Sequence, residues 1–318
     1  MFSEKMNNFK PSIFIKIREA MAECKHPIID LSVGTPDIPP EKHIIDAFRI
    51  SADDPESYKY ALSDTDNLVN AAVLWYEERF GISLKYENIC GLIGSQDGLA
   101  HLPLMLLDPG DGVLIPNPGY PMFYTGAYLS SAKIGFTPLH EENGFLVDYE
   151  NISPTQAHDT KLLIISYPAN PLGRLAPIEF FEKTVWFAKK YDITVIHDNA
   201  YAELTFDGKQ AHSFLEAKGA LDVGVEFNSL SKSYNLTGAR ISFMLGNSAI
   251  CTALKRLKSN IDYGIFKPVQ AMAVAAITGP QECLRHLRAE YQLRRDALCT
   301  TLSEGGWHIT PPEGTMFV

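Results

Sequence analysis

The chain has few cysteines and no long apolar runs. Its five cysteines are scattered without a C-x-x-C pair, which argues against a zinc site or a disulfide framework. No apolar run reaches the length of a membrane span, and the first residues lack the hydrophobic segment of a signal peptide. We therefore expect reduced thiols, a cytoplasmic location and no membrane partner. The cysteines are Cys24, Cys90, Cys251, Cys283 and Cys299.

Positive charge is also scarce. The 318 residues carry 28 lysines and arginines against 38 aspartates and glutamates, a net charge of −10. The densest basic cluster, residues 255–258, has no interleaved aromatic residues and is expected to lie on the surface of a helix. Nucleic acid is therefore not an expected partner. With 46% hydrophobic residues, the composition predicts a soluble globular protein with one large domain or two unequal ones.

Apolar runs of strand length alternate with amphipathic stretches of helix length through the middle of the chain. Such alternation is typical of an α/β fold with a mostly parallel sheet between helices. In these sheets, ligands bind beyond the carboxyl ends of the strands. We predict, in order, helix 64–80, strand 89–94, helix 96–107, strand 112–116, helix 121–129, strand 162–167, helix 177–191 and strand 193–198.

Both ends of the chain depart from this alternation. Residues 28–33 are strand-like and lie in an N-terminal arm, after a short amphipathic piece. From about residue 249 the pattern turns helical, and it includes a long helix over 282–304. The last residues, 316–318, look like the start of a strand. We therefore expect the chain to end inside an element, as a truncated polypeptide would.

One lysine stands among hydroxyl residues between two apolar runs. The stretch Ser229-Leu-Ser-Lys-Ser-Tyr-Asn-Leu-Thr-Gly-Ala-Arg240 places Lys232 on a turn between predicted strands at 224–227 and 241–245. Such a turn partly desolvates the amine, which must lose a proton to attack an aldehyde. Ser229, Ser231 and Arg240 supply hydroxyls and a planar cation that suit a phosphate. Pyridoxal phosphate (PLP) has both groups and is the expected cofactor. A solvated loop is the alternative if this stretch is taken alone.

A second stretch, Cys90-Gly-Leu-Ile-Gly-Ser-Gln-Asp-Gly-Leu-Ala100, predicts a strand, a tight turn and the start of a helix. Backbone N–H groups at a helix N-terminus bind anions, and Ser95, Gln96 and Asp97 stand at that point. Ordinary helix capping would favour the same residue types. Together with the lysine stretch, this turn is a candidate phosphate site.

Asp198 ends the predicted strand 193–198. A buried carboxylate needs a cationic partner, and the protonated ring nitrogen of PLP is one. An aspartate at that nitrogen makes the ring an electron sink. The neighbouring pair His197-Asp198 also suggests a metal, but no second ligand pair follows at a suitable spacing, so no metal is expected. Tyr120, between Gly119 and Pro121, is placed to stack on a flat ring, with a core tyrosine as the alternative.

The lysine stretch closely resembles the PLP-lysine signature of the class I/II aminotransferases, which have fold type I. The 90–100 stretch resembles the G-S-x-(E/D)-G motif of members similar to LL-diaminopimelate aminotransferase. Ser166-Tyr-Pro-Ala-Asn-Pro-Leu-Gly173 resembles the family's N-P-T-G motif, with Leu172 in place of threonine. These motifs cover the chain from about residue 30 onward in the family's order. The loop at 260–266 leans toward the alanine type.

The resemblance implies roles for individual residues. Lys232 would bind the cofactor covalently and move a proton during the reaction. Tyr120 would cover one face of the cofactor ring, while Asn170 and Tyr201 would bond its oxygen. Asp198 would bond the ring nitrogen.

It also implies partners. Tyr60, in Ser57-Tyr-Lys-Tyr-Ala-Leu62, would reach the phosphate of the neighbouring subunit, so a homodimer is implied. The backbone of Gly34 would meet the substrate carboxylate, and Asn170 would also contact the substrate. The implied activity moves an amino group between an L-amino acid and a 2-oxo acid, with the donor left open. A β-lyase, a decarboxylase and a truncated PLP-binding remnant without turnover are the alternatives.

The resemblance finally implies a division of the chain. We expect an arm over 1–41, a large PLP-binding domain over 42–255 and a smaller, incomplete α+β domain over 256–318, to which the arm contributes. Family members usually continue past the Gly-Thr-Met-Phe position, and the continuation carries an arginine that binds the substrate carboxylate. No residue of this chain is assigned that role.

Overall fold

The structure is a computed structural model that describes residues 1–7, 9 and 13–318. The chain divides into two compact units, Met1–Pro36 and Asp37–Val318. The first unit contains the short helix α1 (Glu4–Asn7) and the helix α2 (Ile13–Glu23). The division of the second unit into a large and a small domain stays a prediction.

The predicted strands at the two ends of the chain are wrong. Residues 28–33 form no strand, and Ile29 and Leu31 are 86% and 81% exposed. Residues 316–318 are also irregular, and only Gly314 forms an isolated bridge, to Thr205. A strand needs a neighbouring strand to pair its backbone N–H and C=O groups. Alternating apolar residues do not supply that neighbour.

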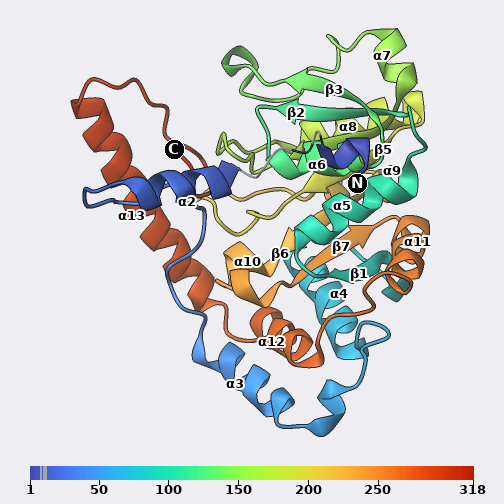
Figure 1. Cartoon of the computed structure of the whole chain (residues 1–318), viewed down its shortest axis with the longest axis vertical. Helices are drawn as coiled ribbons and strands as arrows, with labels where there is room; N and C mark the ends of the chain where they lie inside the picture. The colour runs from blue at the N-terminus through green and yellow to red at the C-terminus, as the bar shows by residue number, and fades with distance from the viewer. Residues whose placement is uncertain (8, 10–12) are drawn as a thin grey trace. The chain divides into compact units, whose positions relative to one another are not determined.

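A seven-stranded sheet forms the centre of the second unit, with the order β1-β7-β6-β5-β4-β2-β3 (Figure 1). The strands from β3 to β6 in this order are parallel, whereas β7 runs antiparallel to both β6 and β1. The predicted mostly parallel α/β sheet is therefore confirmed. The strands are β1 Ile89–Leu92, β2 Gly112–Asn117, β3 Lys133–Pro138, β4 Thr160–Ser166, β5 Thr194–Asp198, β6 Gly224–Ser229 and β7 Ser242–Gly246.

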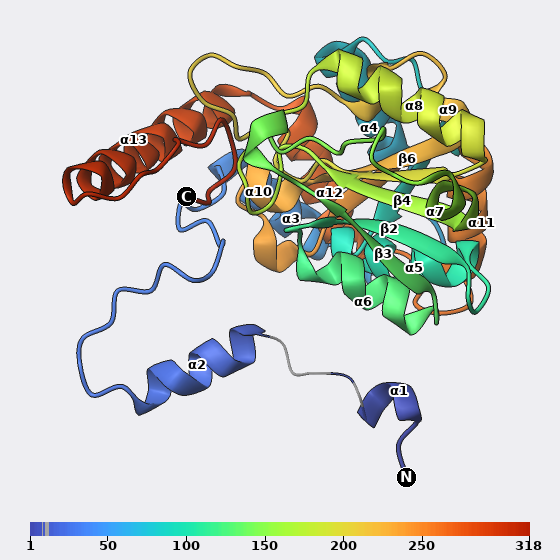
Figure 2. The ribbon, with the colours of Figure 1, turned by 90° about the horizontal axis from the view of Figure 1, so that it is seen from above.

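Helices cover both faces of this sheet (Figure 2), as the alternating pattern predicts. Apart from short 3-10 turns, the described helices of the second unit are α3 Lys42–Ala52, α4 Asp66–Phe80, α5 Ser95–Leu106, α6 Pro121–Leu129, α7 Pro154–Asp159, α8 Ile178–Tyr191, α9 Ala220–Val223, α10 Leu230–Ser233, α11 Ser248–Lys258, α12 Lys267–Thr278 and α13 Glu282–Glu304. None of the helices in the described part combines the length and apolar composition that a bilayer crossing requires.

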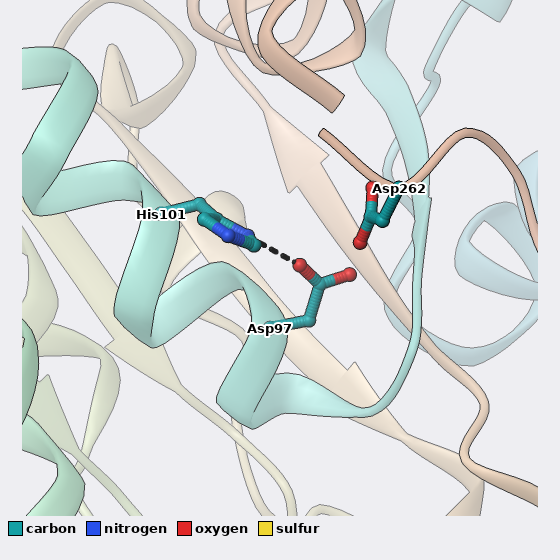
Figure 3. Close-up of side chains that lie close together, drawn as sticks. All are labelled: Asp97, His101 and Asp262. Carbon is teal, nitrogen blue, oxygen red and sulfur yellow. Dashed lines mark hydrogen bonds and ion pairs between the residues drawn. The ribbon is translucent and has the colours of Figure 1, made fainter. Parts of the chain in front are cut away.

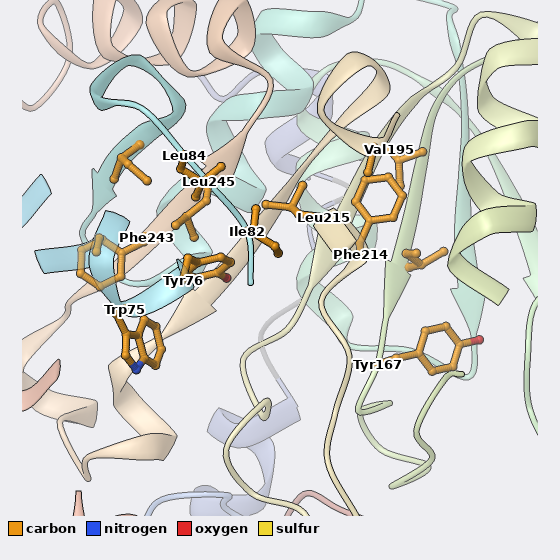
Figure 4. Close-up of a cluster of buried hydrophobic side chains, with 14 of the residues drawn as sticks. Trp75, Tyr76, Ile82, Leu84, Tyr167, Val195, Phe214, Leu215, Phe243 and Leu245 are labelled. Atoms are coloured by element: carbon orange, nitrogen blue, oxygen red, sulfur yellow. The ribbon is translucent and has the colours of Figure 1, made fainter. Parts of the chain in front are cut away.

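Successive strand residues point to opposite faces, so the sheet separates two apolar cores. In β4, Leu163 and Ile165 belong to the core beneath α4, α8 and α12. Figure 4 shows part of this core, including Trp75 of α4. Leu162 and Ile164 belong to the core beneath α5, α6 and α11. All four side chains are fully buried. The near-continuous apolar run in this strand is what a parallel strand covered on both faces requires.

Local signals in the sequence define the ends of α4. The Thr65 hydroxyl accepts a hydrogen bond from the Leu68 N–H at 3.4 Å and caps the first turn. Gly81 ends the helix with a φ of 66°, a conformation that glycine adopts without penalty. Between these caps, Trp75 and Tyr76 belong to the buried face that packs on the sheet.

Candidate active site

Three parallel strands end side by side on one edge of the sheet. Ser166 ends β4, Asp198 ends β5 and Ser229 ends β6. Ser166 is opposite Asp198 in the β4–β5 ladder, and Asp198 is opposite Phe227 in the β5–β6 ladder. The predicted site residues therefore follow strand ends that the sheet brings together, which is where open α/β sheets bind ligands.

Lys232 lies on α10, a one-turn helix between β6 and β7, rather than on a simple turn. The Ser229 hydroxyl accepts a hydrogen bond from the Ser231 N–H at 3.2 Å, and the Ser233 hydroxyl donates to the Ser229 carbonyl at 3.2 Å. These bonds hold the turn that carries the lysine. Burial, together with the charge of Arg240, lowers the pKa of Lys232 to about 8. A larger share of its amine is therefore neutral and nucleophilic near neutral pH.

Arg240 lies beside the turn that begins α5. Its Nη1 donates to the Thr237 carbonyl at 3.1 Å, which orients the guanidinium. A Cβ atom added to Gly94 would stand 2.7 Å from Arg240 Cζ, so the guanidinium packs against this glycine. Arg240 has a φ of 56°, a left-handed conformation that is unusual for a side chain of its size. Backbone strain of this kind concentrates at ligand sites.

The turn itself has the properties of an anion site. Gly94 precedes α5 with a φ of 75°, and the first N–H groups of the helix face outward from its N-terminus. The Ser95 hydroxyl is buried and has no hydrogen-bond partner among the described residues. Gln96 Nε2 donates to the Tyr120 hydroxyl at 2.7 Å and so links this turn to the loop after β2. A phosphate would satisfy the Ser95 hydroxyl and the helix N-terminus together.

The Asp97 carboxylate is engaged by protein donors. It lies 2.6 Å from His101 Nδ1 (Figure 3). It also accepts from the Ile93 N–H at 2.9 Å and pairs with Lys258. Its visible role is therefore to hold the turn before α5 in place. Whether it also contacts PLP stays a prediction.

Lys258 is buried, contrary to the expectation that the 255–258 cluster lies on a helix surface. Its ammonium pairs with Asp97 and lies 3.0 and 2.9 Å from the two carboxylate oxygens of Asp262. Burial by itself lowers the pKa of Lys258, but these two carboxylates outweigh it and raise the pKa above its usual value. Asp97, His101 and Asp262 also have the spacing of a metal site, with ligand atoms within 4.8 Å of one another. The ammonium of Lys258 supplies positive charge to both aspartates of this cluster.

Asp198 is buried at the end of β5, and its Oδ1 lacks a hydrogen-bond partner within the described part of the chain. Burial raises the pKa of Asp198 to about 6, while the neighbouring charge of His197 opposes that rise. A buried carboxylate with an unused oxygen fits a ligand that brings a cationic N–H group. The protonated pyridine nitrogen of PLP is such a group.

Two tyrosines lie within electrostatic reach of Asp198. Burial, with a contribution from the charge of Asp198, raises the pKa of both Tyr120 and Tyr201. Tyr201 is almost fully buried, and Tyr120 is half-buried. Both phenols are therefore protonated and able to donate a hydrogen bond at neutral pH.

The remaining predicted residues lie on loops. Asn170 is half-buried in a tight loop after β4, which is closed by the Gly173 N–H donating to the Ala169 carbonyl at 2.7 Å. Tyr60 is 80% exposed, and its ring centroid lies 5.4 Å from that of Tyr263. Gly34 belongs to the first unit, Met1–Pro36, so its role at the site stays a prediction.

Sequence reasoning missed two buried charged residues near the site. Lys258 holds Asp97, and Glu226 on β6 accepts from His197 on β5. Glu226 could have been noticed in the sequence, because it is an acidic residue inside the apolar run of β6 and a buried carboxylate requires partners. The sequence around Lys258 carried no comparable signal.

Comparisons with known proteins agree on one family. The pattern of "Aminotransferase class I and II" matches residues 26–318. LL-diaminopimelate aminotransferase of Moorella thermoacetica is 42% identical over 321 residues, which cover 99% of this chain and 82% of that protein. Glutamate-pyruvate aminotransferase AlaC of Escherichia coli is 40% identical over 309 residues, covering 96% of this chain and 75% of that protein.

A solved structure gives the same result. The apo structure of BacF from Bacillus subtilis superimposes with a TM-score of 0.94 at 35% identity, covering 99% of this chain and 82% of that one. Sequence and fold therefore agree over nearly the whole chain. The chain belongs to the class I and II aminotransferases, enzymes that move an amino group between an amino acid and a 2-oxo acid.

Proposed function

We propose that this aminotransferase binds pyridoxal phosphate at the carboxyl ends of β4, β5 and β6. The observation that carries the proposal is the buried Asp198 carboxylate, whose Oδ1 has no partner among the residues described. An ionised carboxylate is costly to bury without a cation, and the protonated ring nitrogen of PLP supplies one. Asp198 in turn keeps that nitrogen protonated.

Lys232 would hold the cofactor at its aldehyde and would later carry a proton. Its pKa of about 8, lowered by burial and by Arg240, leaves Nζ able to act as a nucleophile and as a base near neutral pH. Bound PLP supplies an electron sink, which makes the α-hydrogen of an amino acid acidic. Lys232 Nζ would take up this proton and hold it for return to the product.

The phosphate is held by Arg240 and by the turn before α5. The guanidinium against Gly94 and the unpartnered Ser95 hydroxyl support this assignment. Ser229 and Ser231 flank the same site, where Ser229 also caps α10. A permanent cation beside backbone N–H groups is a strong combination for a doubly charged anion.

The cofactor ring is held by aromatic and amide side chains. Tyr120 would pack against the ring, and its hydroxyl is oriented by the bond from Gln96. Asn170 and Tyr201 would donate to the ring oxygen, and the protonated state of Tyr201 supports that role. Asn170 would also contact the substrate.

A homodimer completes the site through Tyr60. Exposed aromatic and apolar side chains gather on the loops around residues 58–62 and 261–266, and such patches mark interfaces. Tyr60 reaches the phosphate of the partner subunit from this surface. A cytoplasmic location is supported by the five cysteines, all of them described and all free. The exposed residues are Tyr58, Tyr60, Leu62, Ile261, Tyr263 and Phe266.

The amino donor is an L-α-amino acid and the acceptor a 2-oxo acid. The names of the relatives favour LL-diaminopimelate, or the pair glutamate and pyruvate, as first candidates. A panel of these compounds, tested pairwise, separates the two relatives' specificities.

The PLP assignment is tested by trapping and by a half-reaction. Borohydride reduction of the PLP-loaded chain should fix the cofactor on the peptide that contains Lys232. The surface variant Lys209→Ala should label normally, and Lys232→Ala should not. An amino acid without an acceptor should release one equivalent of its 2-oxo acid, without ammonia or carbon dioxide. Label on another lysine would refute the cofactor site, and release of ammonia or carbon dioxide would indicate a lyase or a decarboxylase.

A further inference from the structure

Behind the proposed cofactor site, two charged residues are completely buried against each other. His197 on β5 and Glu226 on β6 have side chains with 0% exposure, and they are neighbours in the β5–β6 ladder. His197 Nδ1 lies 2.7 Å from Glu226 Oε2. None of the roles proposed so far uses this pair.

Glu226 is surrounded by hydrogen-bond donors. Besides His197, its Oε1 accepts from the Tyr76 hydroxyl at 2.6 Å and from Asn199 Nδ2 at 3.2 Å. Its Oε2 accepts from the Ser213 hydroxyl and the Phe214 N–H, both at 2.8 Å. Burial by itself raises the pKa of Glu226, but the bonds from His197, Tyr76 and Ser213 outweigh it and lower the pKa below its usual value. Glu226 is therefore ionised, because hydrogen bonds donated to both of its oxygens favour the charged form of the carboxyl group.

Both ring nitrogens of His197 face acceptors. Nδ1 faces the Glu226 carboxylate, and Nε2 lies 2.9 Å from the Tyr167 carbonyl. A carboxylate and a carbonyl have no proton to donate. A neutral imidazole has a single N–H, so one of its nitrogens would face an oxygen lone pair at hydrogen-bond distance. Only the doubly protonated ring satisfies both contacts.

We propose that both ring nitrogens of His197 carry protons, and that the charge of this imidazolium, acting through β5, keeps Asp198 ionised. Consecutive strand residues point to opposite faces, so His197 and Asp198 share a backbone while only Asp198 faces the ligand side. His197 is then a positioning residue that never touches the cofactor. The second half of this inference rests on the proposed role of Asp198, whereas the first half concerns the protonation state of His197 alone.

The surroundings of His197 contain few other charges. Glu226 faces it from β6, and the Tyr167 carbonyl faces it from the end of β4. Phe181 of α8 and Phe214 contribute rings with centroids 4.9 and 6.4 Å from the imidazole. The ionisable Tyr76 of α4 reaches the pair through Glu226, and Asp198 adjoins it along β5. The charge of Glu226 raises the pKa of Asp198, but its effect is smaller than the opposing effect of His197.

Nitrogen NMR of the cofactor-free chain tests the protonation state. Of the nine histidines, all of them in the described ranges, only His197 is buried. We expect one buried histidine whose two ring nitrogens both carry protons, because both face acceptors. His197→Gln should remove this signal. A buried histidine with one bare nitrogen would overturn the proposal, including the case of a neutral His197 beside a protonated Glu226.

The effect on Asp198 is tested with PLP affinity as a function of pH. His197→Gln retains a hydrogen-bond donor but loses the charge, so Asp198 should become protonated at a pH higher by roughly one unit. The acid-side loss of PLP affinity should shift upward by the same amount. His212→Gln is the matched control, since His212 forms a solvent-accessible pair with Glu216 at 3.0 Å, and it should leave the profile unchanged.

The two measurements separate the possible failures. His197 could prove to be protonated while the pH dependence of PLP affinity is the same in His197→Gln and the parent. That result would show that the charge of His197 does not act on Asp198. If His197→Gln does not fold, Glu226→Gln provides the second route, because it should make His197 neutral in the NMR spectrum and shift the PLP profile in the same direction. Borohydride labelling of Lys232 in the parent chain remains an independent check of the cofactor site.

Discussion

The guanidinium of Arg240 packs directly against Gly94, so that a Cβ atom at Gly94 would stand 2.7 Å from Arg240 Cζ. The two residues are far apart in the sequence, on the turn after α10 and the turn before α5. A side chain at Gly94 would push the cation away from the helix N-terminus. The proposed phosphate site therefore depends on this glycine as much as on the arginine.

Gly94→Ala should weaken PLP binding by at least tenfold, because the methyl group displaces Arg240 from the anion site. Gly81→Ala is the matched control. Gly81 also has a positive φ, 66°, but nothing lies within 4 Å of a Cβ added there. Both variants should lose some stability from backbone strain, whereas only Gly94→Ala should lose affinity. Equal PLP dissociation constants for the two variants, measured by fluorescence titration, would contradict this prediction.

The rate at which the cofactor-free chain captures PLP covalently should rise with pH and level off above about 8. Attack requires the neutral amine, and burial with the Arg240 charge lowers the pKa of Lys232 to about 8. Stopped-flow absorbance across this range measures the rate. Lys232→Ala should show no covalent capture and no turnover, while Lys209→Ala should follow the parent profile. A rate that stays flat through this pH range would count against Lys232 as the nucleophile.

Asp198→Asn should stabilise the cofactor-free chain at neutral pH while impairing PLP binding. Burial raises the pKa of Asp198 from 3.8 to about 6, so folding favours its protonated form. The resulting penalty is absent below the unfolded pKa and is fully present above the folded one, where it reaches about 3 kcal/mol at most. The gain from asparagine should therefore appear above pH 6 and fade as the pH falls toward 4.

Urea unfolding at several pH values checks the stability effect, and PLP titration checks the binding effect. With PLP bound, the parent should be more stable than Asp198→Asn, because its carboxylate then has a cationic partner. If Asp198→Asn were less stable than the parent at every pH, Asp198 would not be a carboxylate that is buried at a cost in the cofactor-free chain. A variant that binds PLP as tightly as the parent would show that the ring nitrogen has a different partner.

Lys258→Met should destabilise the chain by about 3–5 kcal/mol, because it leaves two carboxylates without their buried cation. It should also weaken PLP binding, since Asp97 holds the turn before α5 through its bond from Ile93. Lys189→Met removes a surface pair with Asp222 and should cost less than about 1 kcal/mol. Chemical unfolding of both variants is the measurement. A small loss for Lys258→Met, similar to that of the control, would show that the ammonium is dispensable.

The sequence by itself determined the alternation of elements and the positions of the strand ends. Runs such as β4 and stripes such as α8 were predicted to within a few residues, because burial on both faces of a parallel sheet leaves a local pattern. The candidate residues Lys232, Asp198 and Arg240 were also visible, since each carries unusual chemistry next to an apolar run.

Only the tertiary structure decided which segments pair and which charges are buried. β3 was not predicted, because most of this edge strand is partly or fully exposed and lacks a strong apolar run. The 28–33 run was predicted as a strand, but alternation alone does not provide a pairing partner. Lys258 and the His197–Glu226 pair depend on partners contributed by other elements. Burial of a charge is set by neighbours that are distant in sequence, and no local periodicity records them.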